Sequence, residues 1–178
     1  MEMKEEGTET VRRYRPALSV YHPNGRCTGS AIKLSLHPAE GEREGYIKLR
    51  IANQLPNVEE DGKPRFPQFN WLGGKSVRLC FLDLCEILRV LRGETESIAD
   101  GQGLFHRSKP KSSRLTFAHV VEPTCGYRLQ LTVTYDHGEF PDETYEFMMA
   151  DHEACGIMAA IENSMAAIVF GAPEVPAW

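Results

Sequence analysis

Short segments in which hydrophobic and polar residues alternate recur along the chain, a period typical of strands with one buried face. The clearest early case is residues 43–53, where two sets of three residues face opposite ways: Ile47, Leu49 and Ile51 against Tyr46, Lys48 and Arg50. The same alternation predicts strands within 15–23, 29–38 and 75–81. A turn rich in Gly, Glu and Pro separates 29–38 from 43–53, which indicates a hairpin.

The hydrophobic period then changes to that of a helix. Leu84, Ile87, Leu88 and Leu91 fall at i, i+3, i+4 and i+7, which predicts an amphipathic helix over 82–92. At its start, Asp83 and Glu86 fit a variant of the capping box, and a glycine follows the last apolar residue.

The second half of the chain repeats this order of elements. Alternation predicts strands at 103–108, 113–121, 126–135 and 143–149, and an apolar helix follows over 151–170. We therefore predict an α+β domain made of two β-β-β-β-α repeats. Its parts are an acidic disordered tail at 1–9, repeats at 10–93 and 103–171, a linker at 94–102 and a C-terminal tail at 172–178.

Two segments outside the predicted strands carry aromatic rings. Residues 55–74 are rich in proline and glycine and are typical of a long loop, in which Phe69 and Trp71 either stack on a base or cap the core. Residues 99–114 combine basic residues with Phe105 and His106, and this segment is either a mobile clamp or a solvated connector.

Composition limits the class of protein. The chain has 178 residues and a net charge of −5, which suits one domain of ordinary globular composition. No apolar run approaches the roughly 20 residues that cross a bilayer, and the acidic N-terminus is unlike a secretory signal, so we expect no membrane partner. Five scattered cysteines without a C-x-x-C pair indicate reduced thiols and a cytoplasmic protein.

The order of elements resembles that of the PUR-repeat and Whirly proteins, which bind single-stranded DNA and RNA. The resemblance covers about residues 10–170 and rests on two β-β-β-β-α units and their hydrophobic pattern. It implies two curved antiparallel sheets packed with helices. The lysine-glycine motif of the plant Whirly proteins is absent from the sequence, so no individual binding residue is transferred from them.

The strand faces opposite the hydrophobic ones are strongly basic, although the chain as a whole is acidic. They present seven cations interleaved with tyrosine, threonine and glutamine, with Glu146 as the main acid. Basic groups neutralise phosphates, aromatic rings and arginine planes stack on bases, and threonine and glutamine bond base edges. Alternatively, this is an ordinary solvated face. The candidate binding residues are Arg15, Lys33, Tyr46, Lys48, Arg50, Arg78, Arg107, Arg114, Arg128 and Gln130.

The sequence therefore predicts a single-stranded DNA- or RNA-binding protein of weak sequence specificity, acting in transcription or nucleic-acid metabolism. No catalytic motif is recognisable and the pair His152 and Cys155 has no second pair to complete a zinc site, so we expect no enzyme activity, metal or cofactor. The alternative is a protein-interaction or assembly module using the sheets or the Met- and Ala-rich second helix. Under either function, that helix and the strand edges predict a homodimer or homotetramer.

Overall fold

The computed structural model describes residues 16–56, 66–122, 124–138 and 140–172. The first four strands form one antiparallel sheet, called sheet 1, in the order β1-β2-β3-β4. Their bounds are β1 Ala17–His22, β2 Ser30–His37, β3 Tyr46–Asn53 and β4 Lys75–Leu79. Each predicted strand is confirmed, with shorter ends than the sequence pattern covers.

Helix α1 (Phe81–Leu91) follows β4 almost directly and buries its predicted apolar face. The predicted capping pair is wrong. The Asp83 carboxylate accepts the backbone N–H of Cys80 at 2.9 Å. The N-cap residue of α1 is therefore Cys80, and cysteine is not among the residue types favoured at this position. Glu86 instead accepts the N–H of Ala99 at 3.3 Å and pairs with Arg89 at 3.1 Å.

The second half repeats the arrangement. Sheet 2 is antiparallel in the order β5-β6-β7-β8, with β5 Leu104–Ser108, β6 Lys111–Val120, β7 Gly126–Tyr135 and β8 Glu143–Met149. Helix α2 spans Asp151–Phe170, as predicted. Short 3₁₀ turns lie at Ile98–Gly101 and Asp136–Gly138. Two β-β-β-β-α units are thus confirmed.

The predicted linker is part of the packed structure. Ile98 is 1% exposed and joins the common core. Ser97 forms a β-bridge with Ala118, and the N–H of His119 donates to the carbonyl of Glu96 at 2.9 Å. Residues 94–102 therefore connect the repeats while adding to the edge of sheet 2.

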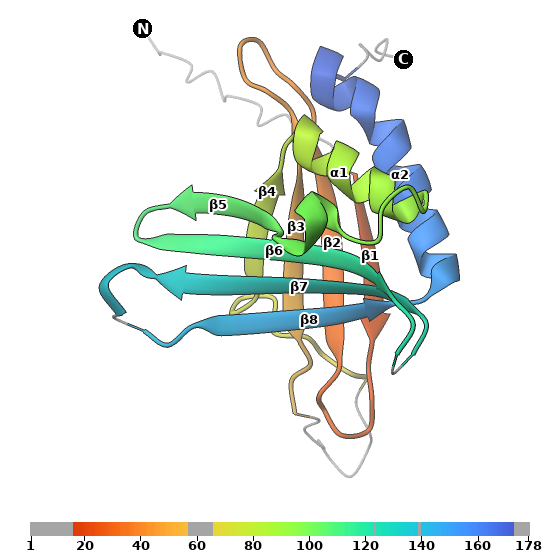
Figure 1. Ribbon diagram of the computed structural model, residues 1–178. Helices are drawn as coiled ribbons and strands as arrows, with labels where there is room; N and C mark the ends of the chain where they lie inside the picture. The colour runs from red at the N-terminus through yellow and green to blue at the C-terminus, as the bar shows by residue number, and fades with distance from the viewer. Residues whose placement is uncertain (1–15, 57–65, 123, 139, 173–178) are drawn as a thin grey trace, which may run out of the picture.

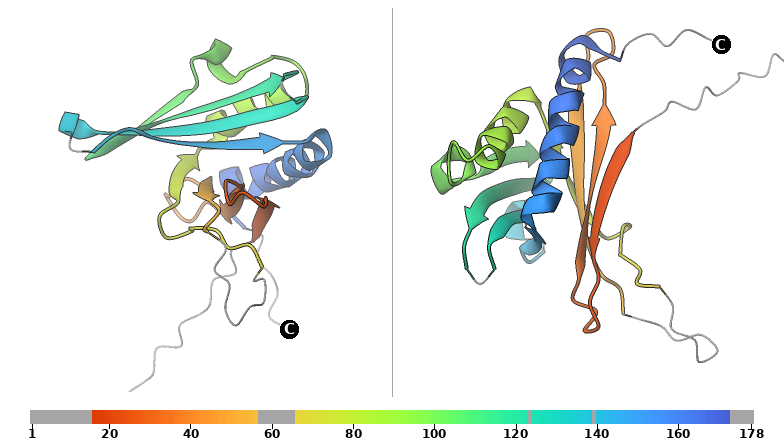
Figure 2. Two further views of the ribbon diagram at one scale, coloured as in Figure 1. Left: turned by 90° about the horizontal axis from the view of Figure 1, so that it is seen from below. Right: turned by 90° about the vertical axis from the view of Figure 1, so that its right-hand side faces the viewer.

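The two sheets are stacked face to face with their strands running crosswise (Figure 1), and the helices fill the space between them at one side (Figure 2). The hydrophobic residues of both sheets and both helices meet in one core, with Leu49, Leu131 and Phe147 at most 1% exposed. Each sheet consequently has one face in this core and one facing outward.

Helix α2 is apolar over much of its length. By length and composition it passes as a membrane span, contrary to the sequence-based expectation, yet only 22% of that stretch is buried. Against the protein it packs through Ile157, Ile161 and Ile168, and Glu162 in its middle pairs with Arg92 of α1 at 2.8 Å. The exposed residues of α2 are mostly small or polar, and its exposed large apolar side chains are Val169 and Phe170 at the C-terminal end.

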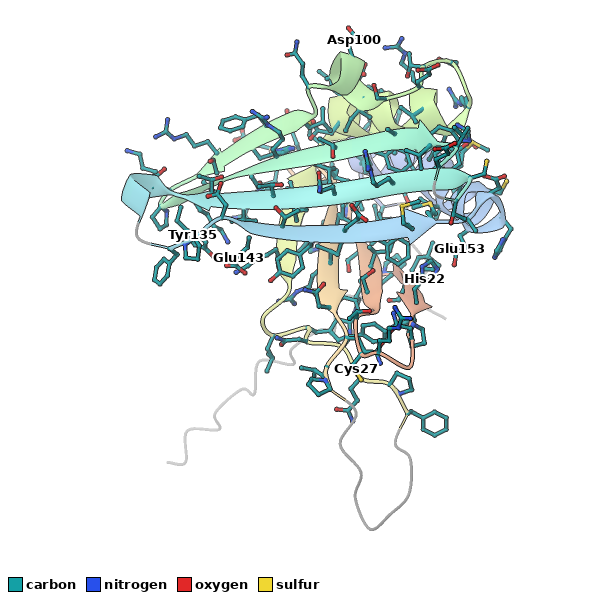
Figure 3. All side chains as sticks on the ribbon, turned by 60° about the horizontal axis from the view of Figure 1, so that its bottom comes forward. His22, Cys27, Asp100, Tyr135, Glu143 and Glu153 are labelled. Atoms are coloured by element: carbon teal, nitrogen blue, oxygen red, sulfur yellow. The ribbon has the colours of Figure 1, made fainter. Side chains whose placement is uncertain are left out.

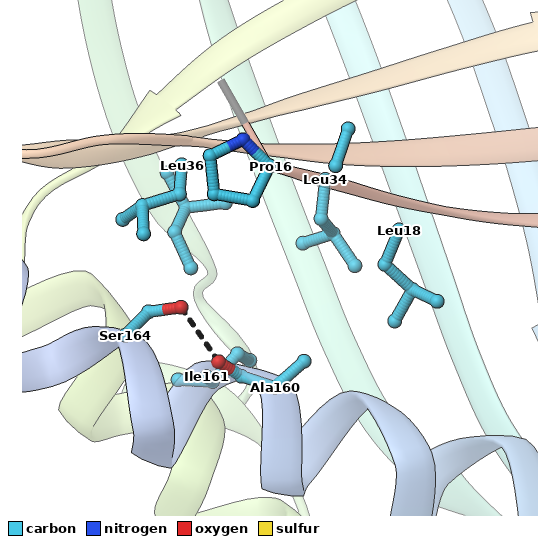
Figure 4. A pocket seen from close by; sticks show the side chains of 9 residues that line it. Pro16, Leu18, Leu34, Leu36, Ala160, Ile161 and Ser164 are labelled. Carbon is cyan, nitrogen blue, oxygen red and sulfur yellow. Dashed lines mark hydrogen bonds between the residues drawn. The ribbon is translucent and has the colours of Figure 1, made fainter. Parts of the chain in front are cut away.

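An apolar cavity of about 220 Å³ lies between α2 and the inner side of β1, β2 and β3. Its walls include Leu18, Leu34 and Ile161 (Figure 4). The one hydroxyl in the wall, that of Ser164, donates to the Ala160 carbonyl at 2.6 Å. The hollow is partly open to solvent, and its side chains offer only apolar contacts apart from this hydroxyl.

The C-terminal end of α2 is bonded to the β2–β3 hairpin. The N–H of Ala39 donates to the carbonyl of Ala167 at 3.0 Å, and that of Gly45 to the carbonyl of Ile168 at 3.2 Å. A Cβ on Gly45 would lie 2.7 Å from the Ile168 backbone, so glycine permits this close approach.

Candidate nucleic-acid interface

The outward side of sheet 1, here called the sheet 1 face, carries five of the predicted binding residues: Tyr46 and four cations. Antiparallel register sets Lys33 of β2 directly opposite Arg50 of β3, and Lys48 of β3 directly opposite Arg78 of β4. The two pairs are two residues apart along β3, which is about 7 Å. The sheet thus brings together cations that are up to 45 residues apart in the chain.

None of these four cations has a carboxylate partner among the described residues. Lys33 and Arg78 are exposed, Lys48 and Arg50 are half-buried, and the Arg50 Nε is buried without a hydrogen-bond partner. Like charges directly opposite one another destabilise a sheet by a few tenths to about 1 kcal/mol per pair. The fold therefore holds a compact cationic cluster that it does not neutralise.

The Tyr46 ring lies at the end of this cluster between two neighbours. The His37 ring from β2 is parallel to it, with centroids 4.4 Å apart and planes at 6°. The Arg78 guanidinium from β4 is 3.9 Å from its centroid. Because β3 lies between β2 and β4, the two neighbours approach the ring from opposite sides. Both faces of the Tyr46 ring are thus covered, and the exposed member of the stack is Arg78.

At the other end of the sheet 1 face, residues 66–74 fold back over the strands. Tyr21 of β1 contacts Phe69 at 5.5 Å and Trp71 at 6.2 Å between ring centroids. Beneath them Ala31 and Ala52 are 0% exposed, although they belong to the outward side. Of the two predicted roles, Phe69 and Trp71 therefore cap a surface, but the surface is the outer face of the sheet rather than the core. Tyr21 itself remains 50% exposed.

The outward side of sheet 2, the sheet 2 face, carries another four predicted residues: Arg107, Arg114, Arg128 and Gln130. Arg114 of β6 lies directly opposite Phe105 of β5 on one side and Thr132 of β7 on the other. Gln130 of β7 lies opposite Glu146 of β8. Phe105 is 63% exposed. The cations here are spaced along the strands, with hydroxyl and amide groups between them.

The basic segment 99–114 is mostly structured. Residues 104–108 and 111–120 form the β5–β6 hairpin, so neither a mobile clamp nor a solvated connector describes it. Arg107 and Arg114 are held in register by this hairpin. Arg15 lies outside the described residues.

The sequence treats the cations as one surface, and here the structure differs. Both sheets turn their hydrophobic sides into the common core, so their basic sides point in opposite directions (Figure 2). The stacking of the sheets, which strand periodicity does not encode, separates the predicted residues into two faces.

The two carboxyl groups with shifted pKa values lie between the layers rather than on either face. A hydrogen bond from Lys75 is the main cause that lowers the pKa of Glu143, with Tyr135 and Tyr145 adding to it against the opposing effect of burial. Burial, followed by the bond to Glu143, raises the pKa of Tyr145. For Glu153, burial is outweighed by hydrogen bonds from His22 and the Ala150 N–H, so its pKa is lowered. These connections lie at opposite ends of sheet 2 (Figure 3).

Within the described part of the chain, no three His, Cys, Asp or Glu side chains lie close enough to hold a metal ion. His152 and Cys155 are both exposed on α2. The chemistry that the two faces offer is positive charge, ring and guanidinium planes, and hydroxyl and amide groups.

His37 is a candidate that sequence reasoning missed. It has the same strand parity as Lys33, so alternation alone places both on the sheet 1 face. Its role in the stack needs the register with Tyr46, which the sequence does not supply.

Solved structures with the same architecture identify the fold. WHY1 from Arabidopsis thaliana superimposes with a TM-score of 0.68 at 14% identity, over 89% of this chain and 87% of that one. The fold is Whirly-like. WHY3 from Arabidopsis thaliana gives a TM-score of 0.67 at 15% identity, covering 89% of this chain and 91% of the other. The resemblance drawn from element order is confirmed at the level of fold.

The Trypanosoma brucei MRP1/MRP2 structure superimposes with a TM-score of 0.58 at 18% identity, over 89% of this chain and 96% of that one. The structure of the plant transcriptional regulator PBF-2 gives a TM-score of 0.65 at 15% identity, over 88% of this chain and 83% of that one. No family model and no curated protein matches the sequence. At these identities the similarity is one of fold.

Proposed function

We propose that this protein binds single-stranded nucleic acid on the sheet 1 face, with weak sequence specificity. The observation that carries the proposal is the pairing of Lys33 with Arg50 and of Lys48 with Arg78, directly opposite and without carboxylate partners among the described residues. A polyanion removes the repulsion within such a cluster and gains from the release of its counterions.

Ring and guanidinium planes at both ends of the cluster favour single strands over duplexes. The exposed Arg78 guanidinium, stacked on Tyr46, presents a plane at one end, and the half-exposed Tyr21 ring lies at the other. Bases of a single strand stack on such planes with little regard to sequence, at about 1–3 kcal/mol per base. A regulatory role in transcription, as the name of PBF-2 states for that protein, is part of this proposal.

The test is a titration with an oligothymidylate at several salt concentrations. In Lys48→Ala/Arg50→Ala, affinity falls and the salt dependence weakens, because each lost phosphate contact on a single strand removes about 0.7 from the logarithmic slope, or about 1.4 for two. The matched control is Arg26→Ala/Arg43→Ala, which removes the same charge from exposed turn residues outside the strands.

Two results would overturn the proposal. One is parent-like affinity and salt slope in Lys48→Ala/Arg50→Ala. The other is tighter binding of a duplex than of the single strand, since stacking on these ring and guanidinium planes needs unpaired bases. Equal losses in the control variant would show that net charge, rather than this face, governs binding.

The helices favour an additional role in assembly. Large apolar side chains are exposed near the N-terminus of α1 and the C-terminus of α2, with Leu82 70% and Phe170 87% exposed. Met158 and Met165, in contrast, pack against the protein's own core. We propose that the exposed helix residues pair with a second copy of the chain. Light scattering at micromolar concentration is expected to give a multiple of 20.0 kDa, and a monomer would refute it.

A further inference from the structure

We propose that the sheet 2 face is a second, separate binding site, so that each chain holds two single strands on opposite sides. This inference rests on the proposed function of the sheet 1 face. It starts from the observation that the predicted cations fall on two faces pointing away from each other, with the common core between them.

The two faces are too far apart around the molecule to act as one local site. Packed sheets are about 10 Å apart, and the side chains of each outward face extend beyond that thickness. A short strand lying on Lys33 and Arg50 therefore has no contact with Arg114 or Arg128. Only a strand that passes around a sheet edge reaches both.

The sheet 2 face has the same kinds of groups in a different layout. Arg107, Arg114 and Arg128 have no carboxylate partner among the described residues, which leaves their guanidinium groups available. Arg107 is opposite Ser112, and Arg128 is opposite Ala118, six residues farther along β6. The line of cations therefore extends about 20 Å along the strands.

Base-directed groups accompany this line. Phe105 is exposed directly opposite Arg114, and Gln130 and Thr116 are paired between Arg114 and Arg128. Phe105 offers a ring face for stacking, and the amide and hydroxyl offer hydrogen bonds to base edges. Glu146 lies opposite Gln130 and is the one acid in this part of the face, which makes the sheet 2 face less positive than the sheet 1 face. We therefore assign the weaker of the two sites to sheet 2.

The consequence is that one chain bridges two strands. The four-cation cluster of sheet 1 binds one segment of nucleic acid. The arginine line of sheet 2 binds a separate segment on the opposite side of the chain. Two segments of one long strand, or two different strands, are equally served by this arrangement.

Calorimetric titration with an oligothymidylate of about six nucleotides, near the short end of single-strand site sizes, tests the inference at low salt. The parent is expected to bind two oligonucleotides per chain. Lys48→Ala/Arg50→Ala and Arg114→Ala/Arg128→Ala are each expected to bind one, and the four-residue combination none. Arg26→Ala/Arg43→Ala is expected to bind two oligonucleotides, like the parent. Circular dichroism of each variant checks that it is folded.

The outcomes separate this inference from the function on which it rests. One oligonucleotide per chain in the parent, with Arg114→Ala/Arg128→Ala unchanged, overturns the second site and leaves the sheet 1 face as the binding surface. Loss of both oligonucleotides in Lys48→Ala/Arg50→Ala places both on sheet 1 and also overturns it. No binding by the parent defeats the proposed function itself.

Discussion

Lys75 of sheet 1 is bonded to sheet 2, and replacing it tests whether polar contacts hold the layers together. Its ammonium group donates to the Tyr135 hydroxyl at 2.9 Å and pairs with the Glu143 carboxylate at 2.8 Å. The two oxygens of Glu143 also accept the hydroxyls of Tyr135 at 2.8 Å and Tyr145 at 3.0 Å. We expect Lys75→Met to destabilise the protein, because Glu143 then loses its only cationic partner among the described residues.

The size of the expected loss in unfolding free energy follows from how far the Lys75 and Glu143 side chains are exposed. Hydrogen bonds to charged groups contribute about 1.5–3 kcal/mol when buried, whereas exposed ion pairs contribute about 0.2–1 kcal/mol. The side chains of Lys75 and Glu143 are 18% and 36% exposed, between these cases. A loss of about 1–2 kcal/mol is expected, which for a protein of this size lowers Tm by about 3–6 °C.

Acid should weaken the same contact. Because the pKa of Glu143 is lowered in the folded protein, its contribution is present above the ordinary glutamate pKa of about 4.3 and is lost as pH falls through the folded value. Glu143→Gln cannot titrate there. It is therefore expected to lose less stability than the parent between about pH 5 and pH 3.

The assay is urea unfolding followed by circular dichroism, at one protein concentration so that assembly contributes equally. Lys75→Met, Glu143→Gln and the double variant form a cycle whose expected coupling is about 1 kcal/mol. Additive effects within about 0.3 kcal/mol would refute the reasoning, because they would mean that the two groups stabilise the fold independently.

Three further changes probe other parts of the molecule. Gly126→Ala is expected to lower Tm by more than 5 °C in a thermal melt, since φ is +150° there and a Cβ would lie 2.4 Å from the Met149 carbonyl; an unchanged Tm would contradict this. Glu153→Ala, which removes acceptors for His22 at 2.7 Å and for the Ala150 N–H at 2.9 Å, should cost about 1–2 kcal/mol in urea unfolding, and a loss under 0.3 kcal/mol would count against it. Tyr46→Ala should weaken binding of an oligothymidylate through its stacked neighbours while leaving the salt slope almost unchanged; unaltered affinity would exclude the stack from the site.

Hydrophobic periodicity was enough to predict the strands and the two long helices of this fold. Alternation in 43–53 gave both the strand and the side to which Lys48 and Arg50 point, because parity alone decides the face. The switch to a period of 3.6 in 151–170 likewise gave the bounds of α2. These features depend on neighbours in the chain.

Features that depend on distant neighbours were missed. The opposition of Lys48 and Arg78 requires the β3–β4 register, and the enclosure of Tyr46 requires contributions from three strands. The opposite directions of the basic faces require the stacking of the sheets. The cap at Cys80 escaped notice because a cysteine seldom occupies that position.

The bonds between the β2–β3 hairpin and the end of α2 make these two surface segments one cooperative unit. The N–H groups of Ala39 and Gly45 have helix carbonyls as acceptors, so their exchange with solvent hydrogen requires the hairpin and the last turn of α2 to separate. The carbonyl of Ile168 in turn gains a partner at a helix end, where acceptors are ordinarily left without intrahelical ones, and that of Ala167 accepts Ala39 in addition to the N–H of Gly171. Local unfolding that begins at either segment therefore spreads to the other, although more than 120 residues separate them in the chain.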